Sequence, residues 1–484
     1  MIYDLLIVGG GINGCAIARD AAGRGLRVLL VEQNDLASAT SSASTKLIHG
    51  GLRYLETYDF RLVHEALAER EILLANAPHI IWPLNFVLPH AKGLRPKWMI
   101  KLGLWLYDHL ATRKTLPKSK MVMLQGNWMG KPLKKEYEIG FTYADCWVDD
   151  ARLVVLNAVN AREYGAEICV GTRLLNATSQ NGSWTATLSN RREVQSRVLI
   201  NAAGPWVSEV LDNIEIKSHK HVKLVKGSHI VVHRQYPGSH AYILQNNDGR
   251  IAFAIPYEGA YTLIGTTDFV HNDAPGPVAI SDVETDYLIE LVNHFWDKPI
   301  AHSDIVWSYA GLRPLYDDGS VNASVVTRDY AFDLNTDSAP VLSIFGGKIT
   351  TARRLAEHAL DELGKFLPSC GNKWTKSAAL PGGGIDFDRF VRQLREDKPL
   401  IDFHLLYRLA RAYGTRAYDL LGDATTNEDL GRDFGHGLTQ AEVDYLIANE
   451  WARSADDILW RRSKLGLHMT QDEQAVLREF VNKE

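Results

Sequence analysis

Residues 5–14 read LLIVGGGING, a run of four apolar residues followed at once by a glycine-rich turn. Apolar residues without polar alternation predict a strand buried on both faces of a parallel sheet. A helix of small residues is expected over residues 15–22, and a second strand over residues 27–31 ends in Glu32. This strand, turn, helix and strand unit indicates an α/β fold.

The glycines of the turn have the G-x-G-x-x-G spacing of dinucleotide-binding folds. The residues expected to bind the dinucleotide here are Gly9, Gly10, Gly11, Ile12, Asn13 and Gly14. The turn lets a pyrophosphate approach the backbone, and the helix N-terminus supplies free N–H groups and a positive dipole. Glu32 can accept from both ribose hydroxyls and would repel a 2′-phosphate, so FAD or NAD is favoured over NADP.

Composition excludes several classes of protein. The 484 residues are 46% hydrophobic and 23% charged, which is ordinary for a globular chain, and the net charge of −5 argues against a nucleic-acid partner. The four cysteines contain no C-x-x-C pair, so no metal site is expected and the usage fits a reducing compartment. We see no signal peptide and no apolar run of about 18 residues, and therefore expect no spanning helix.

A hydroxyl-rich loop follows the acidic residue. Residues 36–54 read LASATSSASTKLIHGGLRY. This loop resembles the one in flavoenzymes of the glutathione-reductase-like and amino-acid-oxidase-like families, in which hydroxyls and backbone amides line the pyrophosphate and the flavin. Its position directly after Glu32 favours FAD over NAD.

Several longer motifs point to one family. The stretch from residue 39 to 55, WVDDARL at 147–153, KGSHI at 226–230, IGTTD at 264–268, GLRP at 311–314 and FGGK at 345–348 closely resemble the FAD-dependent glycerol-3-phosphate dehydrogenases, the bacterial aerobic, respiratory enzymes in particular. The resemblance runs from Asp4 to beyond Trp460. It implies oxidation of sn-glycerol 3-phosphate to dihydroxyacetone phosphate, with hydride passing from C2 to FAD N5. It also implies that the electrons pass to ubiquinone or another membrane quinone.

The resemblance extends the set of cofactor-binding residues beyond the turn and Glu32. The further positions are Thr40, Ser41, Ser42, Lys46, Leu47, Ile48, His49, Gly50, Ala203, Gly204, Gly346, Gly347, Lys348 and Thr350. Lys348 follows two glycines and precedes a predicted helix, so it can direct positive charge at the N1/C2=O edge of the flavin.

A substrate phosphate needs cationic donors, and the fork of an arginine matches phosphate oxygens. In the family, the residues matching Arg53 and Arg313 face the substrate, Tyr54 and His229 match pocket positions, and Lys348 also borders the substrate. The catalytic base is open. His49 and His229 have suitable side chains, whereas Arg313 would stabilise an alkoxide by charge.

We expect a Rossmann-like FAD-binding domain, an inserted antiparallel-sheet substrate domain and a C-terminal helical domain. Apolar runs at 199–203 and 341–345 meet glycine turns, so the chain returns twice to the first sheet. The FAD-binding domain is predicted over 1–75, 145–215 and 305–365, the substrate domain over 76–144 and 216–304, and the helical domain over 385–484. Thr439-x-x-Glu442 and Thr470-x-x-Glu473 predict capping boxes in the last of these.

Residues 92–120 are rich in lysine and arginine, with interleaved aromatic and aliphatic residues. A helix over 97–110 would be amphipathic and basic, which is typical of a helix lying on a membrane surface. The alternative is a helix whose apolar face packs on its own domain. With the family's quinone in view, we expect a cytoplasmic protein bound peripherally to the inner face of the cytoplasmic membrane, with a homodimer as a further expectation.

Three rival functions differ in kind. A glycerophosphate oxidase would share the fold but pass electrons to oxygen, and would form peroxide in air. An amine or 2-hydroxy-acid oxidising flavoenzyme would need a carboxylate clamp. An RNA-binding or catalytically silent flavoprotein is disfavoured by the net charge and by the presence of Arg53 and Arg313.

Overall fold

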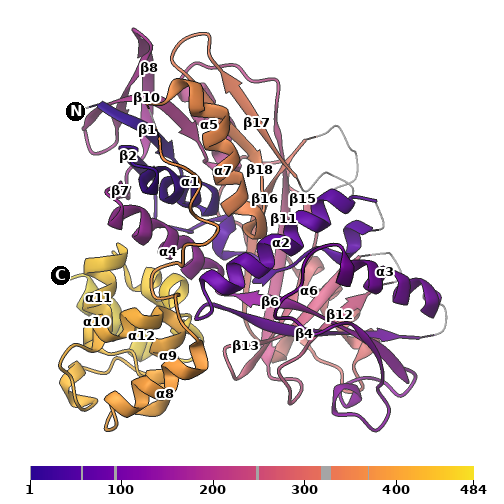
Figure 1. Cartoon of the computed structure of the whole chain (residues 1–484). Coiled ribbons are helices and arrows are strands. Elements are labelled where there is room, and N and C mark those ends of the chain that lie inside the picture. Colours follow the sequence, from indigo (N-terminus) through magenta and orange to yellow (C-terminus); the bar gives the residue numbers. More distant parts are fainter. Residues whose placement is uncertain are drawn as a thin grey trace.

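The computed structural model describes residues 2–55, 58–91, 95–246, 250–317, 329–368 and 370–483, without the side chains of Arg53 and Tyr54. One sheet carries the nucleotide-binding unit (Figure 1). Its order is β17 (Tyr330–Asn335), β18 (Val341–Gly346), β10 (Glu193–Asn201), β1 (Ile2–Val8), β2 (Val28–Glu32) and β7 (Glu167–Val170), with β8 (Leu174–Gln180) and β9 (Ser183–Leu188) added through β10. The five strands from β18 to β7 are parallel, whereas β17 is antiparallel to β18.

Helices cover one face of this sheet because the apolar strands are buried on both sides. These helices are α1 (Ile12–Gly23), α4 (Asp150–Glu163) and α7 (Ala352–Leu363). On the other face, α5 (Val207–Asn213) packs with the β8–β9 hairpin over a second apolar cluster. The parallel sheet with helices confirms the predicted Rossmann-like architecture.

A second, mostly antiparallel sheet is inserted between these segments. It comprises β15 (Phe269–Val270), β11 (Val222–His233), β14 (Tyr261–Gly265), β13 (Ile251–Tyr257), β12 (Ala241–Gln245), β4 (Ile81–His90), β6 (Ile139–Val148) and β3 (Leu47–Ile48), with β16 (Ile305–Tyr316) beside β11 and β5 (Lys120–Met123) beside β6. The helices α2 (Phe60–Asn76), α3 (Lys97–His109) and α6 (Asp282–Phe295) lie around it (Figure 1). The predicted antiparallel sheet is therefore confirmed.

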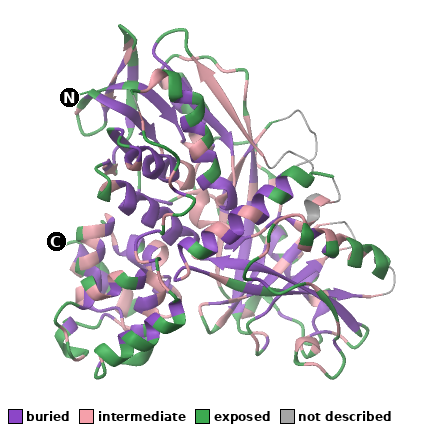
Figure 2. Ribbon diagram, in the orientation of Figure 1, coloured by how far each residue is buried: buried purple, intermediate pink, exposed green. Residues whose placement is uncertain are grey.

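The C-terminal segment is helical, as predicted, and has its own apolar core (Figures 1 and 2). Its helices are α8 (Phe387–Asp397), α9 (Phe403–Tyr413), α10 (Ala417–Leu421), α11 (Gln440–Glu450) and α12 (Gln471–Val481). The capping box of Thr470 and Glu473 forms at α12. The capping box predicted at Thr439 and Glu442 is wrong in the role of Glu442. The Glu442 carboxylate turns inward and accepts hydrogen bonds from Arg408 and Tyr413.

Buried charges join this helical segment to the rest of the chain. Arg152 of α4 pairs with Glu450, and both side chains are about 1% exposed. Arg462 donates to both carboxylate oxygens of Asp35 at 2.7 and 2.8 Å. Such bonds in a dry interface are directional, so the helical domain has a defined docking geometry. Within the described ranges, no helix is both long and apolar enough to cross a membrane.

Candidate active site

A cleft with about 1020 Å³ of open space lies at the carboxyl ends of the parallel strands. Ligands of α/β sheets bind at this edge. Of the predicted cofactor-binding residues, Gly9, Gly11, Ile12, Asn13, Glu32, Thr40, Ser41, Ala203, Gly204, Gly346 and Gly347 line the cleft. The fold therefore brings the first turn, the hydroxyl-rich loop and both later returns of the chain to one place.

The glycines of the first turn leave no room for side chains. Gly9 has φ +113°, and a Cβ on it would lie 2.5 Å from the carbonyl oxygen of Ala202. A Cβ on Gly14 would lie 1.9 Å from the carbonyl oxygen of Gly9. The turn is therefore tight, and α1 begins against it with Gly11 as an N-cap that has no side chain to occupy the helix end.

Polar groups around this helix end suit a dinucleotide. Glu32 accepts from the backbone N–H groups of Gly10 at 2.7 Å and Asn34 at 2.8 Å, while burial raises the pKa of its carboxyl group. The buried Oδ1 of Asn13 accepts no hydrogen bond from the described residues. A bare helix N-terminus, an acidic residue at the end of β2 and an unsatisfied acceptor in one cleft fit FAD.

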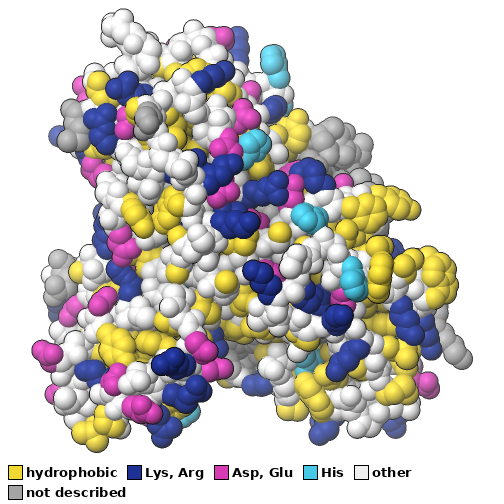
Figure 3. Space-filling model, viewed as in Figure 1, with side chains coloured by type: hydrophobic (Ala, Val, Ile, Leu, Met, Phe, Trp, Pro, Cys, Tyr) yellow, Lys and Arg dark blue, Asp and Glu magenta, His cyan; other side chains and the backbone are white. Residues whose placement is uncertain are grey.

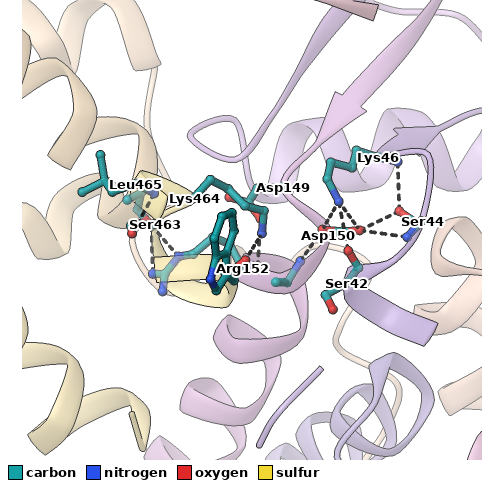
Figure 4. A network of polar contacts seen from close by, with 12 residues as sticks. Ser42, Ser44, Lys46, Asp149, Asp150, Arg152, Ser463, Lys464 and Leu465 are labelled. Atoms are coloured by element: carbon teal, nitrogen blue, oxygen red, sulfur yellow. Dashed lines mark hydrogen bonds and ion pairs between the residues drawn. The ribbon is translucent and has the colours of Figure 1, made fainter. Parts of the chain in front are cut away.

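The hydroxyl-rich loop is held in shape by an internal ion pair (Figure 4). Lys46 Nζ lies 3.0 Å from Asp150 Oδ2 and donates to the carbonyl of Ser42 at 3.0 Å, and both charged side chains are almost fully buried. Ser44 Oγ donates to the same Asp150 oxygen at 2.8 Å. Lys46 thus turns its charge toward the protein interior and shapes the loop, while Ser41 Oγ accepts from Ile12 N at 3.0 Å.

The remaining predicted residues of this loop are not among those that line the cleft. Leu47 and Ile48 form β3 and are buried in apolar clusters. Gly50 N donates to Tyr107 Oη at 2.9 Å, and His49 N lies 3.4 Å from Thr350 Oγ1. Their predicted contact with FAD stays a prediction.

His229 and Arg313 lie on neighbouring antiparallel strands, β11 and β16, where His229 is opposite Tyr309 and Arg313 is opposite Val225, and neither side chain lines the cleft. The His229 ring is fully buried, stacks on Tyr309 with centroids 4.6 Å apart, and lies 3.0 Å through Nε2 from Thr45 Oγ1. Burial, and then the positive charges of Arg313 and Lys46, hold the pKa of His229 well below its usual range. The imidazole is therefore neutral at physiological pH.

Arg313 is held by one loop through three acceptors. Its Nη2 donates to Thr266 Oγ1 at 2.6 Å, its Nη1 donates to the carbonyl of Thr267 at 3.2 Å, and its guanidinium pairs with Asp268. The other side of the guanidinium lies against Gly227, where a Cβ would come within 2.3 Å of Nη2. This arrangement orients the fork while leaving the side chain 21% exposed.

Two predicted substrate residues, Arg53 and Tyr54, lie outside the described side chains. Lys348 directly follows Gly347 at the cleft and starts the 3₁₀ turn Ile349–Thr351. The sequence reasoning missed Thr172, Arg173 and Leu174, which also line the cleft. These residues could have been found from their position after β7, a short strand parallel to β2. The carboxyl end of β7 must reach the same edge of the sheet as that of β2.

Comparison with known proteins agrees with the FAD-binding geometry of the cleft. Residues 4–353 match a family described as FAD dependent oxidoreductase. The chain belongs to this family. Residues 373–482 match the family described as the C-terminal domain of alpha-glycerophosphate oxidase. The protein is therefore a flavoenzyme with FAD as its cofactor.

Relatives of this flavoenzyme are named for polyol phosphates. The chain is 51% identical over its full length to the glycerol-3-phosphate dehydrogenase of Pseudomonas aeruginosa, covering 96% of it. It is 48% identical over 99% of its length to the aerobic glycerol-3-phosphate dehydrogenase of Escherichia coli, covering 97% of it. It is also 50% identical over 99% of its length to D-erythritol 1-phosphate dehydrogenase of Brucella abortus, covering 97% of it. The family resemblance predicted from the motifs is confirmed.

A solved structure supports the fold along the whole chain. The glycerol-3-phosphate dehydrogenase from Bacillus halodurans, complexed with FAD, matches with a TM-score of 0.76 and 26% identity, covering 100% of this chain and 94% of that chain.

Proposed function

We propose that this flavoenzyme oxidises sn-glycerol 3-phosphate to dihydroxyacetone phosphate and passes the electrons to a membrane quinone. The proposal rests on His229 and Arg313, which lie on the neighbouring strands β11 and β16, where the Arg313 guanidinium reaches Gly227, two residues before His229. A phosphomonoester next to a secondary alcohol needs a bidentate cation and a neutral hydrogen-bonding group, and this pair supplies both. Relatives about half identical to the chain carry the same activity in their names.

The residues divide the work as follows. Bound FAD supplies N5 as the hydride acceptor. Arg313 binds the phosphate or the developing alkoxide with a fork that Thr266 and Asp268 already orient, so little reorganisation is needed. His229 holds the substrate as a neutral ring, because burial and two nearby cations make its protonation costly.

His49 is then the better candidate for the proton acceptor. His49 is only partly buried, and its backbone N–H donates to Thr350 Oγ1 at 3.4 Å. A base that reaches solvent can release its proton after each turnover, whereas the ring of His229 is fully buried and stacked on Tyr309.

A second substrate has a specific observation in its favour. The relative from Brucella abortus, named for D-erythritol 1-phosphate, is as similar to the chain as those named for glycerol 3-phosphate. Both compounds place a secondary alcohol near a terminal phosphate, so the same arginine and histidine would serve either one. Selectivity between them would depend on the space beside the reacting carbon.

The test is anaerobic reduction of the bound flavin by a panel of sn-glycerol 3-phosphate, D-erythritol 1-phosphate, glycerol and a 2-hydroxy acid. We expect rapid bleaching by glycerol 3-phosphate and none by glycerol, which lacks the phosphate. Faster bleaching by erythritol phosphate would reassign the substrate, and bleaching by the 2-hydroxy acid alone would refute both assignments. Stoichiometric peroxide in air, without quinone reduction, would replace the dehydrogenase by an oxidase.

We also propose that α3 lies on the inner face of the cytoplasmic membrane. Trp98 and Trp105 are 64% and 56% exposed, Leu102 is 49% exposed, and these three share one side of the helix. Leu104 and Tyr107 on the opposite side are buried, so the helix packs on its domain without using the tryptophans. Hydrophobic and basic side chains gather where Figure 1 places α3 (Figure 3), which suits an anionic lipid surface.

A further inference from the structure

A buried carboxylate connects α6 to β11 and to the loop after β14 that holds Arg313. Glu284 lies in the first turn of α6, is 0% exposed and contributes nothing to the cleft lining. We propose that Glu284 is a positioning residue that sets the geometry of Arg313 and His229. The inference rests on the proposed function, since it concerns the same pocket.

The two oxygens of Glu284 have different partners. Oε2 accepts from Ser281 N and Oγ, both at 2.9 Å, which closes a capping box at the start of α6. Lys226 Nζ lies 2.7 Å from the same oxygen. Oε1 accepts from Ser228 Oγ and Thr267 Oγ1, both at 2.8 Å. One oxygen therefore holds the helix end, and the other joins a strand residue to a loop residue.

These two bonds lead directly to the pocket. Ser228 precedes His229 on β11, and its N–H donates to Thr267 Oγ1 at 3.0 Å. Thr267 supplies the carbonyl that Arg313 bonds, and its two chain neighbours supply the other two acceptors of the guanidinium. Moving Thr267 would therefore move these three acceptors of Arg313, together with the backbone beside His229.

Helix capping alone does not require this arrangement. Glu473 occupies the same position in the capping box of α12 and accepts from Thr470 N at 2.7 Å and Thr470 Oγ1 at 3.0 Å, within its own turn. Burial raises the pKa of Glu284, but its bonds from Lys226, Ser281, Ser228 and Thr267 outweigh that effect, so its pKa lies below the usual value. A charged, dry carboxylate bonded at both oxygens is a rigid anchor.

The experiment compares Glu284→Ala with Glu473→Ala, which removes the matching cap far from the pocket. Flavin content, thermal midpoint, the anaerobic rate of flavin reduction by glycerol 3-phosphate, and its substrate dependence are measured on the FAD-loaded proteins. We expect Glu284→Ala to keep FAD and to lose on the order of 10- to 100-fold in the reduction rate at saturating substrate, because a small misalignment costs this much. Glu473→Ala should lose thermal stability without losing rate.

Two further variants keep the proposal testable if Glu284→Ala does not fold. Glu284→Gln keeps the shape and should recover most of the rate. Thr267→Val leaves the α6 cap in place but removes the hydroxyl that links Glu284 to the loop, and should reproduce the loss. Wild-type reduction rates in Thr267→Val and in any flavin-replete Glu284→Ala would overturn the proposal.

A second measurement does not depend on the substrate. Inorganic phosphate is titrated into the protein, and its binding is detected through the change in flavin absorbance. Loss of the positioning residue should weaken phosphate binding on the order of tenfold, because the phosphate-binding arginine loses its orientation. If glycerol 3-phosphate fails to reduce the wild-type flavin, the proposed substrate is wrong while the phosphate titration still decides the role of Glu284. Unchanged phosphate affinity together with unchanged rate would remove that role.

Discussion

The nucleotide cradle and the substrate pocket are built in opposite ways. The cradle is centred on one short stretch, the glycine turn of residues 9–14 with Glu32, and later returns of the chain at Ala203 and Gly346 complete it. The proposed substrate site takes His229 from β11, Arg313 from β16 and Thr266 from the loop after β14, with Glu284 of α6 behind them. Cofactor binding therefore depends on local backbone geometry, and substrate handling depends on side chains that only the tertiary fold brings together.

The comparison predicts which substitutions separate the two activities. A change in the cradle removes FAD and with it every later step. A change in the pocket leaves the flavin in place and alters only the chemistry. The following substitutions test that division.

The largest effect is expected from Gly14→Ala. The added Cβ would lie 1.9 Å from the carbonyl oxygen of Gly9, which the backbone cannot relieve without opening the turn. We expect purified protein with essentially no bound FAD, measured by the flavin absorbance and by release in acid. Gly103→Ala is the control, because a Cβ there meets no atom within 4 Å. A yellow Gly14→Ala protein would show that the cradle tolerates more than its geometry suggests.

Arg313→Lys should give the next largest effect. Lysine keeps the charge but cannot bond Thr266, Thr267 and Asp268 as a fork, so its orientation toward the substrate is lost. We expect flavin reduction to slow on the order of 100-fold with full FAD content. Arg197→Lys, at a half-exposed arginine that pairs with Asp4, should stay at the wild-type rate. A normal rate for Arg313→Lys would remove this residue from the site.

The pH dependence of flavin reduction tests whether His229, rather than His49, is the catalytic base. Since burial and two cations hold the pKa of His229 well below its usual range, this ring stays neutral as the pH falls through about 6.5. His229→Asn should therefore lower the rate of flavin reduction by the same factor at each pH between about 6 and 8. If its effect disappears below about pH 6.5, His229 titrates in that range and is the base.

The smallest effect on the chemistry is expected from Trp98→Ser combined with Trp105→Ser. Both rings are more than half exposed, so neither should be needed for folding or for activity with an artificial electron acceptor. Binding to anionic vesicles and quinone-coupled activity in membranes should both fall, and salt should remove only part of the wild-type binding, because apolar burial is not screened. Unchanged vesicle binding would place the membrane contact elsewhere.

Much of the cradle could be predicted because its signals are local. The glycine spacing, the apolar strands and Glu32 are close in sequence, and their geometry follows from backbone sterics and strand burial. The helical C-terminal segment was also predictable, and its capping box of Thr470 and Glu473 forms as expected. The capping role predicted for Glu442 was wrong because Arg408 and Tyr413, which are distant in the sequence, donate to its carboxylate.

The parallel-sheet architecture, the dinucleotide cradle and the family follow from the amino-acid sequence, since each depends on residues close together or on long motifs. Three features needed the folded structure: Lys46 turns inward to Asp150, Thr172 reaches the cleft, and Glu284 bonds the loop that holds Arg313. The physical reason is that a side chain's partner is set by which distant elements meet in the dry interior. There, every buried charge or hydroxyl must find a bond within reach.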